Sequence, residues 1–256
     1  MFDRKKPGLL VDTGRLHWIG GKTVEGRHLT SVATSNFSSP GARETREALP
    51  WGWSNMGAVR LPDGRVFLAG GESQIAPNGD VNFPFRKCLV GSSDFGTWTE
   101  LPNVPIDRAH VASRPAAAFA TSGDGGEIVL TVTVGDEMFM SVPSWVEIEI
   151  QAENSLTLCS LRYDLTSSGP TSTWTRVSHP NIGFRGSKTV QLGTTFLLVG
   201  GYSGEGDSKD FNERVLEFDF ATKSLQPLRI PNYDGYRVMN ADIVTEIGYQ
   251  YESDGG

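Results

Sequence analysis

Short apolar runs that end in a pair of glycines recur along this chain of 256 residues. The clearest copies are residues 65–71 (RVFLAGG) and 195–201 (TFLLVGG), and residues 16–21 (LHWIGG) form a weaker one. A fourth run, residues 128–135, keeps a single glycine. A continuous apolar run of this length, bounded by turn residues, is typical of a strand buried on both faces. We expect positive φ angles and close backbone contact at the paired glycines, which are Gly20, Gly21, Gly70, Gly71, Gly200 and Gly201.

Each clear run is flanked by further segments that are predicted to be strands. A shorter strand precedes it, as at residues 58–61, 116–121 and 189–192, and a third strand follows it, at residues 87–90, 156–164 and 214–220. A fourth strand carries Trp98 in the second unit and Trp174 in the third, whereas Leu225 takes that place in the last unit. The pattern predicts units of four antiparallel strands, with the tryptophans packed between neighbouring units.

The last position of each glycine landmark gives a period for these units. These positions are 21, 71, 135 and 201, so the units are 50, 64 and 66 residues apart. Such spacing is typical of β-propellers with four-stranded blades. The chain also has a tyrosine and an aspartate at positions 163 and 164, with Trp174 following, and Phe218 and Asp219 after the last glycine pair. With these residues it resembles the kelch-repeat β-propellers over roughly residues 9–251, and Tyr163 is the tyrosine of that pattern.

The kelch resemblance implies an all-β fold: a kelch-type β-propeller of four-stranded antiparallel blades, with four clear repeats and a partial fifth. The blades would span residues 9–50, 51–105, 106–180 and 181–232, with the partial blade at 233–256, in a single domain of residues 1–256. Two alternatives remain open at this point. The chain is either a five-bladed ring in which residues 241–251 complete a blade with N-terminal residues, or a fragment of a longer propeller.

The composition narrows the class of protein and its partners. The chain has 30 glycines and 14 prolines, and these residues destabilise helix interiors by about 1 and 3 kcal/mol, which argues against a helical bundle. The net charge of −7 argues against a nucleic-acid partner, because phosphate backbones attract basic surfaces. Runs of 18 apolar residues do not occur, so we expect no membrane span.

The cysteines and the N-terminal sequence bear on the compartment. Cys88 and Cys159 are expected to be buried, reduced thiols on strands. The N-terminal residues lack the apolar core of a signal peptide. We therefore predict a cytoplasmic protein, and secretion stays open if the sequence is incomplete at its N-terminus.

Residues 39–49 allow two local structures. Ser39 could cap a short helix that has Pro40 at its first position. The repeat instead requires the fourth strand of the first unit here, ending near Leu49. Both alternatives stay open from the sequence.

The sequence contains no motif of a catalytic or metal site. The four histidines, at positions 17, 28, 110 and 179, do not have metal-binding spacing. Residues 78–82 (NGDVN) space their oxygen side chains like the start of a calcium loop, but Phe83 stands where glycine is required. Residues 92–98 (SSDFGTW) resemble the Asp-box turn of sialidases with one residue deleted, a motif that caps a hairpin. We therefore expect no catalytic residues, no metal and no cofactor, and the sequence favours a protein that is not an enzyme.

Candidate binding residues lie in the loops and connectors between the predicted strands. Arg108, Arg185 and Arg237 recur at similar positions in the connectors, and the longest loops carry Phe83, Phe85 and Trp145. One interpretation is an arginine-lined mouth with an aromatic rim, since loops on a rigid scaffold concentrate function. The other is that these arginines tie neighbouring blades by donating to backbone carbonyls.

The resemblance implies a non-catalytic binding module as the main functional hypothesis, with a protein partner bound through the loops of one face. The alternative is a carbohydrate-binding or carbohydrate-active protein, similar to the sugar-acid epimerases and oxidases built on kelch scaffolds. It depends on the arginines, whose planar groups suit the carboxylate of a small glycan. We expect neither a nucleic acid nor a membrane as partner.

Overall fold

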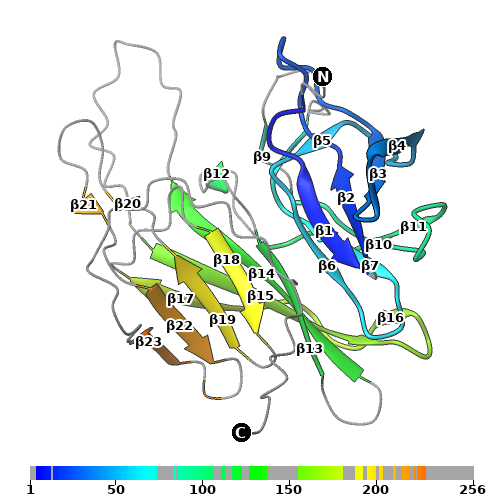
Figure 1. The fold of residues 1–256 in the computed structure, drawn as a ribbon. Helices are drawn as coiled ribbons and strands as arrows, with labels where there is room; N and C mark the ends of the chain where they lie inside the picture. Colours follow the sequence, from blue (N-terminus) through cyan, green and yellow to red (C-terminus); the bar gives the residue numbers. More distant parts are fainter. Residues whose placement is uncertain are drawn as a thin grey trace, which may run out of the picture.

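The computed structural model describes most of the first half of the chain and the strands of the second half. The described residues are 4–12, 14–73, 83–84, 86–105, 111–112, 117–122, 127–137, 155–180, 188–192, 195–199, 202–203, 210–211, 215–219, 222 and 224–228. Within these ranges the chain forms strands and turns and no helix (Figure 1). No helix able to cross a membrane occurs in the described part of the chain. The strand pairs are antiparallel, so the predicted all-β class is confirmed.

Four main sheets succeed one another along the chain; three have four strands, and the third has six. The first sheet consists of β1 (Gly8–Asp12), β2 (Arg15–Ile19), β3 (Ser31–Asn36) and β4 (Ser39–Glu47). The second consists of β6 (Gly57–Arg60), β7 (Val66–Ala69), β10 (Cys88–Gly91) and β11 (Trp98–Leu101). The third consists of β13 (Ala117–Ser122), β14 (Glu127–Glu137), β15 (Ser155–Asp164) and β17 (Thr175–Pro180), extended by the short strands β12 (Val111–Ala112) and β16 (Gly169–Pro170). The fourth consists of β18 (Lys188–Leu192), β19 (Thr195–Val199), β22 (Val215–Asp219) and β23 (Ser224–Leu228).

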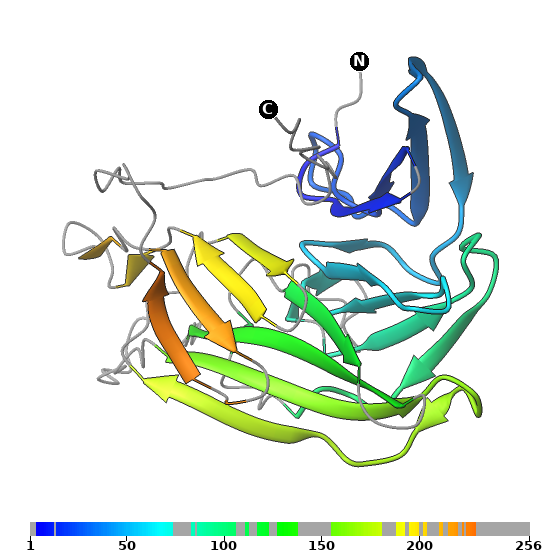
Figure 2. The same cartoon turned by 60° about the horizontal axis from the view of Figure 1, so that its bottom comes forward.

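These strands lie where the glycine pattern predicts them, within one or two residues at most ends. The sheets follow one another in an arc, from the first (blue) through cyan and green to the fourth (yellow and orange) (Figure 2). The first strands of neighbouring sheets lie against each other, β1 beside β6 and β6 beside β13.

Residues 39–47 form strand β4, so the strand alternative is confirmed and the helix alternative is wrong. β4 pairs with β3 from Arg43 to Glu47 and again at Ser39, with a register shift between Ser35 and Asn36. The side chains of residues 42–47 are exposed. Pairing with β3 supplies hydrogen-bond partners for the backbone N–H and C=O groups of this segment. The first sheet thereby takes all four of its strands from residues 8–47, whereas residues 241–251 lie outside the described part of the chain.

Strand β7 is buried on both faces, as its continuous apolar run predicts. Val66 and Leu68 belong to the apolar cluster shared with the first sheet, which includes Ile19. Phe67 and Ala69 belong to the cluster shared with the third sheet. All four side chains of β7 are fully buried, and burial of each of the three larger ones stabilises the fold by about 1.5–3 kcal/mol.

The two predicted tryptophans make the same contact in successive sheets. The indole Nε1 of Trp98 donates to the carbonyl oxygen of Ala48 at 2.6 Å. The indole Nε1 of Trp174 donates to the carbonyl oxygen of Pro102 at 2.8 Å. Ala48 and Pro102 each directly follow the fourth strand of the preceding sheet. The tryptophans therefore pack between neighbouring units as predicted, and the side chain of Leu225 has no N–H with which to repeat the bond.

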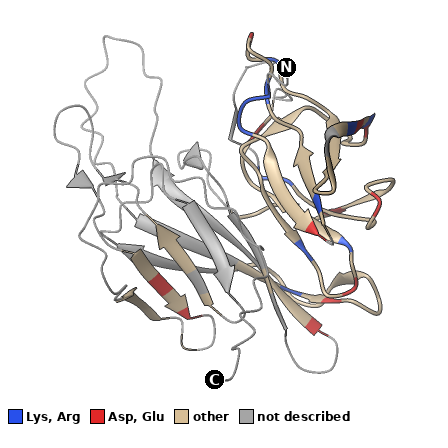
Figure 3. Ribbon diagram, viewed as in Figure 1, with Lys and Arg blue, Asp and Glu red and all other residues tan. Residues whose placement is uncertain are grey.

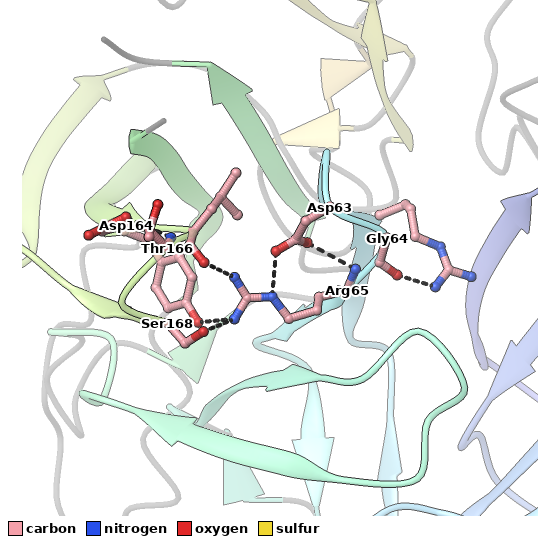
Figure 4. Close-up of polar contacts among 9 residues, drawn as sticks. Asp63, Gly64, Arg65, Asp164, Thr166 and Ser168 are labelled. Carbon is pink, nitrogen blue, oxygen red and sulfur yellow. Dashed lines mark hydrogen bonds and ion pairs between the residues drawn. The ribbon is translucent and has the colours of Figure 1, made fainter. Parts of the chain in front are cut away.

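Arg65 ties the second sheet to the third (Figure 4). Its Nη1 donates to the hydroxyls of Tyr163 at 2.9 Å and Ser168 at 2.8 Å, and its Nη2 donates to the carbonyl of Leu165 at 2.9 Å. Its Nε donates to Asp63 at 2.6 Å, which orients the guanidinium group. Burial raises the pKa of Tyr163, against the opposing effect of Arg65. A carbonyl contact between sheets is the structural role that the sequence suggested for three other arginines.

Residues 92–97 form a tight turn between β10 and β11, the hairpin position expected for the Asp-box resemblance. Its Asp94 accepts hydrogen bonds from the Ser92 hydroxyl at 2.5 Å and the Gly96 amide at 3.0 Å. These bonds, that from Ser92 first, lower the pKa of the Asp94 carboxyl. The turn also buries Phe95 between the first two sheets, because Phe95 belongs to the cluster of Ile19 and Val66.

The described glycine pairs have the predicted backbone conformation. Their φ angles are +58° at Gly20, +101° at Gly21, +70° at Gly70 and +77° at Gly71. A Cβ atom on Gly20 would lie 2.1 Å from the carbonyl oxygen of Trp53, and one on Gly71 would lie 2.3 Å from that of Ser54. Neighbouring backbone therefore occupies the space that a side chain needs, and Gly200 and Gly201 lie outside the described residues.

The glycine pairs yield a stability prediction. We expect Gly71→Ala to lower the free energy of unfolding by about 2–4 kcal/mol, because it combines positive φ with a clash against fixed backbone. Gly14→Ala is the matched control: its φ is +79°, but no atom lies within 4 Å of the added Cβ. It should cost only about 1 kcal/mol. Urea denaturation of both variants provides the measurement, and equal losses would contradict the steric explanation.

Candidate functional site

The chain forms a further short ladder just beyond the glycines in each of the four units. The residue two positions after the first glycine makes these pairs: Lys22 with Lys5 and His28, Glu72 with Ser54 and Pro84, Glu137 with Val111, and Tyr202 with Phe211. The strands involved are β5 (Trp53–Ser54), β8 (Glu72–Ser73), β9 (Phe83–Pro84), β20 (Tyr202–Ser203) and β21 (Asp210–Phe211), together with β12 and β14. Figure 1 shows β5, β9, β12, β20 and β21 on the upper side of the drawing. We call the end of the molecule that is defined by Lys22, Glu72, Glu137 and Tyr202 the Gly-Gly end.

An ion pair joins the first two units at the Gly-Gly end. Lys22 Nζ lies 2.5 Å from Glu72 Oε2, and the two side chains are only 13% and 2% exposed. Each residue directly follows the glycine pair of its own sheet. A charge pair removed from water in this way depends on both partners, because loss of one leaves the other buried and uncompensated.

Asn55 and His28 complete the surroundings of Glu72. Asn55 Nδ2 donates to Glu72 Oε1 at 2.5 Å, so both carboxylate oxygens are bonded. His28 Nδ1 lies 3.1 Å from the backbone carbonyl oxygen of Glu72. Asn55 has a φ of +57°, a conformation that asparagine tolerates better than most residues. Its backbone N–H donates to the carbonyl oxygen of Lys6 at 2.9 Å. Glu72 thereby connects both sheets, and Asn55 adds the N-terminal segment.

Arg4 fixes the N-terminal segment onto the first sheet. Its Nη1 donates to the carbonyl oxygens of Trp18 at 3.0 Å, Gly20 at 2.8 Å and Ser31 at 2.8 Å. Its Nη2 donates to the Ser31 hydroxyl at 2.9 Å. Burial lowers the pKa of Arg4, with Glu47 acting in the opposite direction. Three carbonyls at the Gly-Gly end are thus satisfied by one side chain.

This arrangement is suited to holding chain segments in place. The Glu72 carboxylate is almost fully buried and both of its oxygens are occupied, a poor position for taking a proton from a substrate. Within the described ranges, no group of three histidine, cysteine, aspartate or glutamate side chains is placed to hold a metal ion. Ser73 continues the anchoring, because its hydroxyl donates to the carbonyl of Gly52 at 2.8 Å. The segments that leave the sheets at this end therefore start from fixed points.

Only one of the six predicted binding residues lies among the described residues. Phe83 is in β9, opposite Ser73 of β8, and so belongs to the Gly-Gly end. Phe85, Trp145, Arg108, Arg185 and Arg237 lie outside the described residues, and their roles stay predictions. The same holds for the arginine-lined mouth and for the carbohydrate alternative that depends on it. Of the cysteines, Cys88 is confirmed as a buried free thiol, and Cys159 is placed on β15.

Sequence reasoning missed the residues that build this end of the molecule. Lys22, Glu72 and Asn55 were not among the predicted site residues, nor was Arg4. A signal was nevertheless present, since Lys22 and Glu72 have opposite charges at equivalent positions of neighbouring repeats. In a repeat protein, equivalent positions of adjacent units lie close together.

A second polar cluster lies between the first two sheets at His17, which is 4% exposed. Its Nε2 lies 3.0 Å from Asp12 Oδ1, its Nδ1 lies 2.9 Å from Thr34 Oγ1, and its ring centroid lies 5.0 Å from that of Phe95. Asp12 also pairs with Arg60 of the second sheet. Burial, followed by repulsion from Arg15 and Arg46, lowers the pKa of His17 to about 4. The imidazole is therefore neutral near pH 7; its hydrogen bonds stay within the first sheet, and its contact with the Phe95 ring reaches the second unit.

Comparison with known proteins bears on the fold alone. No protein-family model matches the chain, and no curated protein sequence matches it. Among solved structures, the chain is similar to that of YjhT, with a TM-score of 0.58 and 15% sequence identity. The match covers 90% of this chain and 67% of YjhT. Similarity at this identity supports the all-β fold and leaves function to be argued from the residues.

The Lys22–Glu72 pair predicts strong energetic coupling between the first two units. We expect Glu72→Gln and Lys22→Met each to lower the free energy of unfolding by about 3 kcal/mol, because each leaves a buried partner charge. The double variant should lose much less than the sum of the two single losses. The exposed pair of Lys87 and Glu100, at 35% and 45% exposure, is the matched control and should show coupling of less than about 1 kcal/mol. Additive losses at Lys22 and Glu72 in urea denaturation would show that the pair contributes no coupling.

His17 predicts a specific loss of stability in acid. Its pKa is about 4 in the folded chain and about 6.5 in an unfolded chain, so the unfolded state binds more protons between these values. Stability from His17 is therefore complete above pH 6.5 and is lost as the pH falls toward 4. Between pH 7 and pH 4.5 the wild type should lose about 2 kcal/mol more than His17→Gln. Unfolding free energies at the two pH values test this, and parallel losses in both proteins would refute it.

Proposed function

We propose that the chain is a non-catalytic binding module, built as a kelch-type β-propeller, whose Gly-Gly end binds a partner protein. One observation carries the proposal: in all four units the chain forms a further short bridge or ladder directly after the strand that ends in glycine, at the same end of the molecule. Backbone that is already held in ladders loses little conformational entropy when a partner binds. Loops presented by a rigid scaffold are also where function concentrates.

The propeller part of the proposal is supported by the contacts between successive sheets. The first strands β1, β6 and β13 lie side by side, as the inner strands of a propeller do around its axis. Trp98 and Trp174 repeat one contact from sheet to sheet. The glycine pairs make their close backbone contacts at the ends of second strands. A radial arrangement of four-stranded blades accounts for all three features.

A protein partner is favoured by the aromatic residues that the sequence has in its longest predicted loops. Phe83 is placed on β9 next to β8, and Phe85 follows it two positions later. Aromatic side chains are enriched at the centres of protein interfaces, where they bury large areas at a small entropic cost. Phe83, Phe85 and Trp145 are therefore the residues that we propose contact the partner.

Site-specific photo-crosslinking tests the proposal. A photoreactive phenylalanine analogue is introduced singly at Phe83, Phe85 or Trp145, and at Phe37 as control. Phe37 is 52% exposed and lies in the β3–β4 turn, where its amide donates to Gly14 at the opposite end of the first sheet. After irradiation in cell extract, mass spectrometry should identify one common protein adduct at positions 83, 85 and 145 that is absent at position 37.

Two outcomes would contradict a protein-binding Gly-Gly end. Equal labelling at position 37 would place the interface elsewhere or show that capture is unspecific. Absence of any adduct, combined with a rise in melting temperature on adding sialic or uronic acids, would favour the carbohydrate alternative.

A further inference from the structure

A basic corner lies at the Gly-Gly end of the first sheet. It consists of Lys5, Lys6 and Arg27, all exposed, around the exposed residues Val24 and Glu25. Residues 4–6 and 22–27 together hold five basic side chains and one acidic side chain, whereas the whole chain holds 23 and 30. Figure 3 shows the basic residues of this N-terminal segment at the upper end of the first sheet. The corner is therefore a local reversal of the charge of the protein.

The backbone of the basic corner is held in a fixed conformation on both sides. On one side, Lys5 and Lys22 exchange backbone hydrogen bonds of 2.8 and 2.7 Å, and the four bonds of Arg4 hold the preceding residue. On the other side, the Thr23 amide donates to the Arg27 carbonyl at 2.9 Å, and the Gly26 amide donates to the Thr23 carbonyl at 3.1 Å. The basic run at positions 4–6 is thus part of the folded structure.

The fold places like charges opposite each other in this corner. Lys5 faces Lys22 across the antiparallel bridge, an arrangement that destabilises a β-ladder when neither charge is compensated. The buried carboxylate of Glu72 compensates the charge of Lys22. The pKa of Glu25 is lowered mainly by a hydrogen bond from Thr23, with smaller contributions from Arg27 and Lys5. Arg27 and Lys5 therefore both favour the charged form of the exposed Glu25 carboxylate.

We propose that the basic corner binds an acidic peptide segment of the partner protein, with Lys5 and Arg27 pairing with its carboxylates. Lys6 adds charge beside them, and Val24, 51% exposed, offers contact to an aliphatic side chain. Glu25 competes with the carboxylates of the partner for the same cations. The inference deepens the proposed function by assigning the chemistry of the partner, and it rests on that function only for the claim that the segment belongs to a protein.

A peptide suits this corner better than a nucleic acid does. Tight binding of a nucleic acid comes from many phosphate contacts at once, and the corner offers three exposed cations. The net charge of −7 repels an extended polyanion from the rest of the surface. A short acidic segment can pair with these three cations, and one aliphatic side chain in it can contact Val24.

Fluorescence anisotropy with a defined peptide tests the inference. The probe is a fluorescein-labelled octapeptide of aspartate and glutamate with one central leucine, measured with the full chain at low ionic strength. The double variant Lys5→Gln with Arg27→Gln should weaken binding about three- to tenfold, the size expected for two exposed ion pairs. Glu25→Gln should strengthen binding about two- to fivefold, because the competing carboxylate is removed.

The control variant removes the same number of charges from the opposite ends of the sheets. It combines Arg15→Gln, next to the β1–β2 turn, with Arg162→Gln, whose side chain is 66% exposed. This variant should bind the octapeptide as the wild type does. Circular dichroism of each variant checks that the fold is retained. Glu25→Gln adds an independent test, because it should raise the affinity for the octapeptide and not lower it.

Three outcomes would overturn the acidic-peptide inference. The first is an equal loss of binding in the control variant, and the second is a failure of Glu25→Gln to strengthen binding. The third is tighter binding of a single-stranded oligodeoxynucleotide of the same charge. If the yield of the photo-crosslinked adduct at position 83 is unchanged in the Lys5 and Arg27 double variant, this inference fails while the proposed function stands. If the octapeptide binds as expected but no adduct forms, the proposed function fails instead.

Discussion

Strand β7 is buried on both faces, and the need to pack another sheet against each of its faces organises the described structure. Its residues alternate between two apolar clusters, one shared with the first sheet and one with the third. A sheet with two apolar faces is unstable alone, so each unit depends on its neighbours. Trp98, Trp174 and Arg65 then fix the positions of adjacent sheets through hydrogen bonds to backbone carbonyls.

Close packing of the sheets has a consequence at the Gly-Gly end. Backbone carbonyls of Trp53 and Ser54 fill the positions where Cβ atoms of Gly20 and Gly71 would lie. Lys22 and Glu72 directly follow the glycine pairs of the two units, and their side-chain atoms Nζ and Oε2 lie 2.5 Å apart, largely removed from water. The buried pair and the bonds of Arg4 and Asn55 give this end of the molecule the rigidity that a binding surface requires.

The strands of the fold could be predicted from the sequence, because their signals are local. Apolar runs such as residues 66–69, bounded by turns and glycines, correspond to strands at their predicted places. Residues 39–47 were ambiguous, since their composition suits a helix, and the free edge of β3 decides for a strand. The candidate site was less accessible to prediction. The aromatic and arginine residues in loops were recognised by type alone, whereas Arg4 and Asn55 act through carbonyls and amides that no side-chain pattern reveals.

The sequence by itself determined the all-β class, the succession of four-stranded units and the positions where only glycine fits, because periodicity and backbone conformation are properties of short segments. Only the tertiary structure decided which charged residues meet. Lys22 and Glu72 are 50 residues apart, and so are Trp98 and the carbonyl of Ala48. Their contacts depend on how closely two sheets stack and at which register, and these distances are set by the packing of the whole core.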